Sequence, residues 1–284
     1  MKRVIISIIV LMQFAVSASL NGQNHKVYSE SKDREIFANY ISVMKGKENL
    51  PIEKLMVETA KFFLSVPYVA HTLELEPEGL VINLRGLDCT TFVETVIALS
   101  KTIKSGEPSF EKFGNNLALV RYREGKITGY QDRLHYTTDW MYENEKKGLI
   151  TRVIHTPQWT KLNVDLNIMS SNPDKYKQLS GNEALTSLIK DKEREITSRE
   201  HLYLPANKIE KNKHLFKSGD IVGFTTNIKG VDVSHMGIIY KEGSHLSFIH
   251  ASLSHKKVLV NREPLSEYIK KTKGTGVVLA RVNE

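Results

Sequence analysis

The sequence predicts an α+β fold, in which helices come first and an antiparallel sheet follows. Apolar side chains recur at helical spacing in residues 33–45: Ile36, Phe37, Tyr40, Ile41 and Met44. Further along, residues 219–262 consist of short β-branched runs separated by turns that contain Gly, Asn, Ser or Lys. Helices before and strands after are typical of this fold class.

The first 22 residues have the pattern of a secretory signal peptide. Two basic residues precede a mostly apolar run over residues 4–12, and small residues follow up to Ala18. A retained signal anchor is the alternative, but Gln13 leaves the run short of the ~20 apolar residues that a span needs. We therefore expect an exported, periplasmic protein with no stable membrane insertion after the signal is removed.

Length and composition are consistent with one domain over residues 23–284. Its roughly 260 residues suffice for one large domain or two small ones, and 40% hydrophobic with 25% charged residues is ordinary for a globular chain. Without Lys2 and Arg3 the formal charge of +8 becomes about +6. This surplus suits a carboxylate-bearing glycopeptide, although solubility alone explains it more simply. We expect no nucleic-acid partner.

The helical part of the chain is predicted to contain three convincing helices. Two of them, residues 33–45 and 55–64, fall within an N-terminal helical region over about residues 30–66. A possible strand over residues 81–84 follows. The third helix, residues 89–104, is capped by Asp88 and ends before Ser105-Gly106.

The remaining elements are an insertion and a sheet. Residues 107–215 form the least regular part and are predicted to be a mostly helical insertion, with helices near 131–147 and 181–199. The predicted sheet is an antiparallel meander, followed by a helix over residues 265–271 and a last strand over 276–282. The strands of the meander are residues 221–224, 231–240, 246–252 and 257–260.

Cys89 is the only cysteine, which is unusual for an exported protein because oxidising compartments favour paired thiols. It occupies the first position of its helix, where free backbone N–H groups and the helix dipole favour a thiolate and could also hold an oxyanion. The alternative is that Cys89 is a small buried hydrophobe. A basic side chain beside Cys89 would favour the interpretation of Cys89 as a nucleophile.

Two histidines on adjacent predicted strands are candidates for that base and its orienting partner. His235 shares one strand face with Gly237, which would allow the cysteine helix to approach closely. His250 follows fifteen residues later and could fix the tautomer of His235. A buried structural histidine is the alternative. The histidine spacing does not support a zinc site, so we expect neither a metal nor a cofactor.

Four motifs in order resemble the NlpC/P60 superfamily of papain-like cell-wall hydrolases: residues 88–92 (DCTTF), 219–224 (GDIVGF), 234–238 (SHMGI) and 248–252 (FIHAS). The resemblance implies a papain-like fold, with the nucleophile helix packed on an antiparallel sheet. It implies Cys89 as the nucleophile, His235 as the base and His250 as the third polar residue. It also implies that Tyr68 lines the site.

Two departures from the usual superfamily pattern point to one branch. Thr90-Thr91 replaces the usual Ser-Gly, and Cys89 lies 146 positions before His235, a longer spacing than usual. Both resemble the N-acetylmuramoyl-L-alanine amidase-like branch, as do residues 67–70 (PYVA), 87–94 (LDCTTFVE) and 133–136 (RLHY). That branch often has a glycine where this chain has His71.

This branch resemblance implies a cysteine amidase that cuts between N-acetylmuramic acid and L-alanine of the stem peptide. Peptidoglycan or its muropeptide fragments would be the partner, and the insertion would supply a selective cleft wall. The substrate-binding candidates are Tyr68, Asp88, Arg133, His135, Tyr136, Asp139 and Trp140. The alternatives are a D-glutamyl-diamino acid endopeptidase of the NlpC/P60 type and an inactive wall-binding protein. Trp140 and Tyr136 could equally be helix-packing residues.

Overall fold

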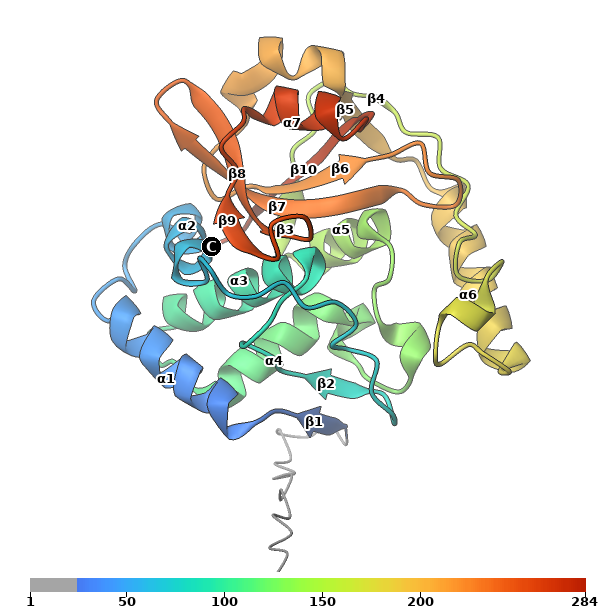
Figure 1. Cartoon of the computed structure of the whole chain (residues 1–284), viewed down its shortest axis with the longest axis horizontal. Helices are drawn as coiled ribbons and strands as arrows, with labels where there is room; N and C mark the ends of the chain where they lie inside the picture. Colours follow the sequence, from blue (N-terminus) through green and yellow to red (C-terminus); the bar gives the residue numbers. More distant parts are fainter. Residues whose placement is uncertain (1–24) are drawn as a thin grey trace, which may run out of the picture.

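The computed structural model describes residues 25–284, so the predicted signal peptide over residues 1–22 lies outside the described residues. The described chain is a mixed α/β fold, in which a helical layer packs under an antiparallel sheet (Figure 1). Within this part of the chain, no helix is long and apolar enough to cross a membrane.

The main sheet has eight strands, all paired antiparallel. Along one path its strands are β4 (Thr160–Lys161), β5 (Leu202–Pro205), β10 (Gly276–Val282), β6 (Ile221–Thr225), β7 (Val233–Glu242), β8 (His245–Ser252) and β9 (Lys257–Val260). The eighth strand, β3 (Ile150–Arg152), pairs with β10. Because β6 to β9 are neighbours in chain order, the predicted meander is confirmed.

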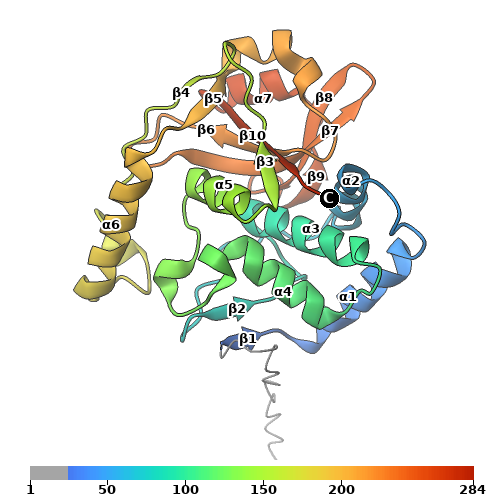
Figure 2. The same cartoon turned by 180° about the vertical axis from the view of Figure 1, so that it is seen from behind.

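Within residues 25–284 the chain also forms a second, small sheet and seven α-helices. In the small sheet, β1 (Lys26–Tyr28) pairs in parallel with β2 (Gly79–Val81). The helices are α1 (Ser31–Met44), α2 (Ile52–Phe62), α3 (Cys89–Lys104), α4 (Phe110–Arg121), α5 (Thr137–Lys146), α6 (Glu183–Ser198) and α7 (Leu265–Lys271). Figure 2 shows α1 to α5 together below the sheet and α7 above it. Short 3-10 turns cover Arg123–Gly125, Tyr130–Asp132, Pro173–Lys175, Ala206–Lys208 and Glu210–Leu215.

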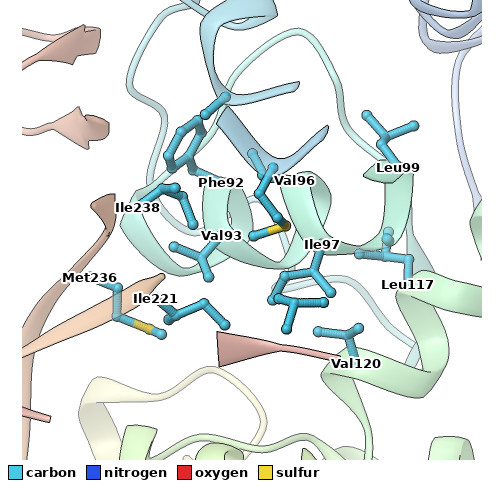
Figure 3. Packing of buried hydrophobic residues seen from close by; sticks show 14 of the residues in the cluster. Phe92, Val93, Val96, Ile97, Leu99, Leu117, Val120, Ile221, Met236 and Ile238 are labelled. Carbon is cyan, nitrogen blue, oxygen red and sulfur yellow. The ribbon is translucent and has the colours of Figure 1, made fainter. Parts of the chain in front are cut away.

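Helix α3 is the centre of the main core, and its predicted bounds and cap are confirmed. The Asp88 carboxylate accepts a hydrogen bond from the Thr91 N–H at 2.8 Å, while the Asp88 N–H donates to the Thr91 hydroxyl at 2.9 Å. This reciprocal cap fixes where the helix begins. Its apolar side chains, including Val93, pack against Met236 and Ile238 of β7 (Figure 3).

The other face of the sheet packs against α7 and forms a second apolar cluster. Phe224 of β6 and Phe248 of β8 lie there, with ring centroids 4.9 Å apart, and both contact Tyr268 of α7. The sheet is therefore covered on both faces near β6, β7 and β8. Side chains that alternate along these strands are divided between two cores.

The predicted insertion over residues 107–215 contributes buried side chains to all three apolar clusters, including Trp159 and Leu204 to the cluster on the α7 side of the sheet. Helices α4 and α5 belong to the main core, where α4 packs along α3 and carries the buried residue Phe113. Helix α6, predicted over residues 181–199, lies to one side and packs with a separate cluster of seven buried side chains. These are Tyr130, Tyr136, Leu166, Met169, Leu179, Ile189 and Ile196.

One buried carboxylate ties the separate cluster together. Glu193 of α6 is 1% exposed, and its Oε1 accepts hydrogen bonds from the Tyr136 hydroxyl at 2.5 Å and from the N–H groups of Met169 and Ser170 at 3.1 and 3.2 Å. Hydrogen bonds to a charged, buried acceptor are stronger than neutral ones. Glu193 therefore fastens the loop before α6 to residues beside α5.

Candidate active site

A cleft of about 390 Å³ lies where the N-terminal end of α3 meets the beginning of β7. Cys89 and Thr90 line it from the helix, and Ser234, His235 and Met236 line it from the strand. The facing wall comes from the insertion and includes Tyr130, His135, Tyr136, Met169 and Tyr176. Segments that are far apart in the sequence therefore meet around Cys89.

Cys89 stands at the first position of α3, as predicted, and its side chain is partly exposed. Its Sγ lies 4.0 Å from the Thr90 hydroxyl. Burial of the sulfur and the charge of Asp88 raise the pKa of the Cys89 thiol to about 11, although the N–H of Met236 and the polar groups of Thr90 act in the opposite direction. At neutral pH the sulfur is therefore a thiol, so the helix terminus alone does not produce the expected thiolate.

His235 and His250 form a hydrogen-bonded pair, as the strand spacing indicated. His235 Nε2 lies 2.6 Å from His250 Nδ1, and the two rings are nearly perpendicular, at 84°. Burial lowers the pKa of His235 to about 4. Burial, together with the neighbouring His235 and His255, lowers the pKa of His250 to about 3. Both imidazoles are therefore neutral at pH 7, and a neutral imidazole can accept a proton.

The expectation that Gly237 lets the cysteine helix approach is wrong. A Cβ at Gly237 would lie 2.9 Å from the Phe248 ring and 3.4 Å from the His250 Cβ, so Gly237 makes room for β8 side chains. His235 lies near Phe224 and Tyr268 on this same side of the sheet. Helix α3 packs against the opposite face of the sheet, and Cys89 and His235 line the same cleft from the first position of α3 and the beginning of β7.

The hydrogen bond between His235 and His250 allows two tautomeric arrangements, and only one of them leaves His235 Nδ1 free to act as a base. If His235 Nδ1 is to accept a proton, His235 Nε2–H must donate to His250 Nδ1, and the proton of His250 must then sit on Nε2. His250 is 2% exposed, and its Nε2 has no hydrogen-bond partner among the described residues. The arrangement that makes His235 a base therefore leaves one buried N–H unsatisfied, at a cost of about 1–3 kcal/mol.

Asp88 directly precedes the cysteine and Tyr68 lies near enough to feel its charge, but neither residue lines the cleft itself. The Tyr68 N–H donates to the Lys256 carbonyl at 2.9 Å, which attaches this segment to the loop before β9. Burial, Cys89 and Asp88 raise the pKa of the half-buried Tyr68 to about 12, so its hydroxyl is protonated and can donate. The Asp88 carboxylate is used by the helix cap.

The three candidates around residue 135 have different surroundings. His135 and Tyr136 line the cleft, where His135 Nε2 lies 2.9 Å from the Tyr130 carbonyl and the Tyr136 hydroxyl is held by Glu193. Arg133 is 7% exposed and does not line this cleft. Its guanidinium donates to Glu74, Glu78 and the Leu73 carbonyl, at 2.7–3.1 Å. Arg133 thus anchors the loop before β2.

Trp140 and Asp139 are also away from the cleft lining. Trp140 is 1% exposed and packs in the main core, which matches the alternative of a helix-packing residue. Asp139 is 1% exposed and accepts from Arg123 and Arg199, so it ties α5 to the end of α6. Their surroundings are those of structural residues.

Several lining residues were not among the predicted site residues. His71 lines the cleft with a φ of 60°, a left-handed conformation that glycine adopts more easily. Lys175, Tyr176 and Lys177 come from the loop before α6. The buried Asp232 accepts from the N–H and hydroxyl of Thr138, each at 2.7 Å. Among residues 25–284, no group of three or more His, Cys, Asp or Glu could hold a metal ion.

Residues 58–277 match the AmiA-like family, described as N-acetylmuramoyl-L-alanine amidase-like. An N-acetylmuramoyl-L-alanine amidase from Bacteroides uniformis has a solved structure similar to this chain, with 40% identity and a TM-score of 0.77; the alignment covers 82% of this chain and 99% of the other. A search among curated proteins finds no match.

Two further solved structures are similar. A Bacteroides fragilis protein with the provisional name of a xylanase is 37% identical over 80% of this chain and all of its own, with a TM-score of 0.75. A Legionella pneumophila protein is 20% identical over 89% of this chain and 95% of its own, with a TM-score of 0.66. The Legionella likeness concerns the fold alone.

Proposed function

Because this chain belongs to the N-acetylmuramoyl-L-alanine amidase-like family, we propose that it hydrolyses the amide between the lactyl group of N-acetylmuramic acid and L-alanine of the stem peptide. Peptidoglycan or its soluble fragments are the substrate. The observation that carries this proposal is that Cys89 and the hydrogen-bonded His235 line one cleft. The N-terminal pattern over residues 1–22 supports export to the periplasm.

The first half of the proposed reaction forms a thioester. His235 Nδ1 takes the proton from Cys89 Sγ, and the sulfur attacks the lactyl carbonyl carbon. The backbone N–H of Cys89 donates to the resulting oxyanion. When the C–N bond breaks, His235 returns the proton to the departing amine of L-alanine. The raised pKa of Cys89 and the lowered pKa of His235 favour a neutral resting pair, so proton transfer accompanies attack.

The second half releases the sugar product. Water gives a proton to His235 Nδ1, and its oxygen bonds to the thioester carbon. The C–S bond then breaks, the lactyl carboxylic acid leaves, and the sulfur recovers its proton. No hydrogen bond joins Cys89 to His235 within residues 25–284; in substrate-free enzymes such contacts are often long and tighten when substrate binds.

The arrangement around Cys89 also supports a papain-like fold of the NlpC/P60 type. In that fold a helix carries the cysteine at its N-terminal end and packs on an antiparallel sheet that carries the histidines. Helix α3 and the strands β7 and β8 have this relation. His250 is then a positioning residue, because it acts on the substrate only through His235.

Product analysis of a defined disaccharide tripeptide tests the proposed function. The amidase predicts two masses, the disaccharide with a free lactyl carboxylate and the intact tripeptide that begins with L-alanine. A D-glutamyl endopeptidase would instead release the diamino acid and leave a disaccharide dipeptide. Unchanged substrate would indicate a wall-binding protein. Either of these last two results, or loss of activity on chelation of metals, would overturn the proposal.

A further inference from the structure

A short segment of the cleft wall carries two positive charges toward the solvent. We call residues 175–177 the lysine wall: Lys175 and Lys177 are exposed, and Tyr176 between them is half-buried against the separate cluster. All three line the cleft that contains Cys89. The backbone is held locally, because the Tyr176 N–H donates to the Pro173 carbonyl and the Tyr176 carbonyl accepts from the Leu179 N–H, each at 2.9 Å.

The lysine wall is fastened to the rest of the molecule a few residues before it. Glu193 accepts hydrogen bonds from the N–H groups of Met169 and Ser170 and from the hydroxyl of Tyr136. Met169 and Tyr136 line the same cleft as the lysines. The segment is therefore a wall with a fixed backbone and exposed lysine side chains, which suits the capture of an ionic group.

The two carboxylates of the cleft lining, Glu74 and Asp232, are already held by hydrogen-bond donors. Glu74 is paired with Arg133 at 2.8 Å, and Asp232 accepts from Thr138 and from the Val233 N–H at 2.7 Å. Lys177 comes only within 4.0 Å of Glu76. Within residues 25–284, Lys175 forms no ion pair or hydrogen bond through its ammonium group. Among the described residues, Lys175 is therefore a cation of the cleft lining that no carboxylate neutralises, and Lys177 is held only loosely by one.

We propose that the lysine wall binds a free carboxylate of the stem peptide and so makes charged muropeptides the preferred substrates. This inference rests on the proposed function. The stem peptide carries such carboxylates on D-glutamate and on the diamino acid, whereas the sugars of the substrate lie on the other side of the scissile bond. A lysine ammonium is a flexible point charge that tolerates a carboxylate at variable position.

The test compares two disaccharide tripeptides, one with free carboxylates on D-glutamate and the diamino acid and one with these groups as amides. For the free form, the K175Q/K177Q variant should raise KM about three- to thirty-fold, as for two exposed charge pairs, and should leave kcat within about two-fold. For the amidated form, the KM of K175Q/K177Q should equal the KM of the natural protein. The KM difference should also shrink in about 0.5 M salt.

Two control variants separate charge from structure. K175R/K177R keeps both charges and should retain the natural KM. K190Q changes an exposed lysine of α6 outside the cleft lining and should have no effect. An unchanged KM in K175Q/K177Q, or an equal loss for both substrates, would overturn the inference.

A binding measurement keeps this inference separate from the proposed function. Calorimetry with the free tripeptide and its amide does not depend on turnover. If the natural protein cleaves neither muropeptide, the proposed function is wrong. In that event weaker binding of the free tripeptide by K175Q/K177Q still supports the subsite, and equal binding overturns it.

Discussion

The two walls of the cleft are built in different ways. The wall with Cys89 and His235 belongs to α3 and β7, which are backed by the two large cores on either side of the sheet. The facing wall, with Tyr136 and Tyr176, is backed by seven buried residues and one carboxylate, Glu193. The proposed reactive groups thus lie on the part of the molecule that is costly to deform, and the proposed substrate contacts lie on a part that can vary independently.

The sharpest test of this division is the removal of the sulfur. C89A should abolish hydrolysis of a disaccharide tripeptide, lowering kcat by about a thousand-fold or more, because no other group can form the thioester. Mass spectrometry of the products measures the loss. Thermal unfolding should change little, since Cys89 is only partly buried. Retention of full activity in C89A would show that the chemistry lies elsewhere.

The protonation state of Cys89 in the first wall can be measured by alkylation. Iodoacetamide reacts with the thiolate, and a thiol pKa of about 11 means that each pH unit below it lowers the thiolate population about ten-fold. The alkylation rate should therefore rise by about a hundred-fold from pH 6 to pH 8. A rate that is already flat over this range would indicate a thiolate–imidazolium pair and would contradict the neutral resting state.

The orienting histidine is expected to have the next largest effect. H250A should lower kcat by about a hundred-fold with little change in KM, because His235 would lose the partner that fixes its tautomer. The control is H245Q, which changes an exposed histidine at the start of the same strand. If kcat falls together with the melting temperature, and the pH profile of kcat does not change, the role of His250 is merely structural.

The second wall should respond to the loss of its fastening. E193A leaves three donors without their acceptor and should lower the free energy of unfolding by about 1–3 kcal/mol. KM should rise several-fold while kcat stays nearly constant, because α3 and β7 are untouched. E193Q keeps an acceptor oxygen and should be milder. Steady-state kinetics and denaturant unfolding measure these two effects. A fall in kcat would contradict the independence of the two walls.

The first wall could be predicted from the sequence because its signals are local. Asp88 and Thr91 mark the start of α3, and alternating apolar residues mark β7 and β8. Alternation does not say which face of a strand meets which neighbour, however. For this reason His235 and Gly237 were expected against α3, although they lie on the side of Phe248 and α7.

The second wall depends on contacts that no local pattern reports. Helix α4 was missed because Gly114-Asn115-Asn116 has low helix propensity, and its packing on α3 overrides this weakness. Lys175 and Lys177 reach the cleft only through the cluster around Glu193. Arg133 has the chemistry of a substrate ligand, but it is buried between Glu74 and Glu78. Residue type alone could not distinguish these cases.

The position of β10 affects the order in which the molecule can assemble. Residues 276–282 form the final strand in the sequence, yet they lie inside the sheet, between β6 on one edge and β3 with β5 on the other. A growing chain that has reached residue 270 already contains every residue that lines the cleft, but β6 still lacks one of its two neighbouring strands. Pairing between strands so far apart in the sequence is slow, so the sheet that carries β7 is completed only after residues 276–282 have joined β6.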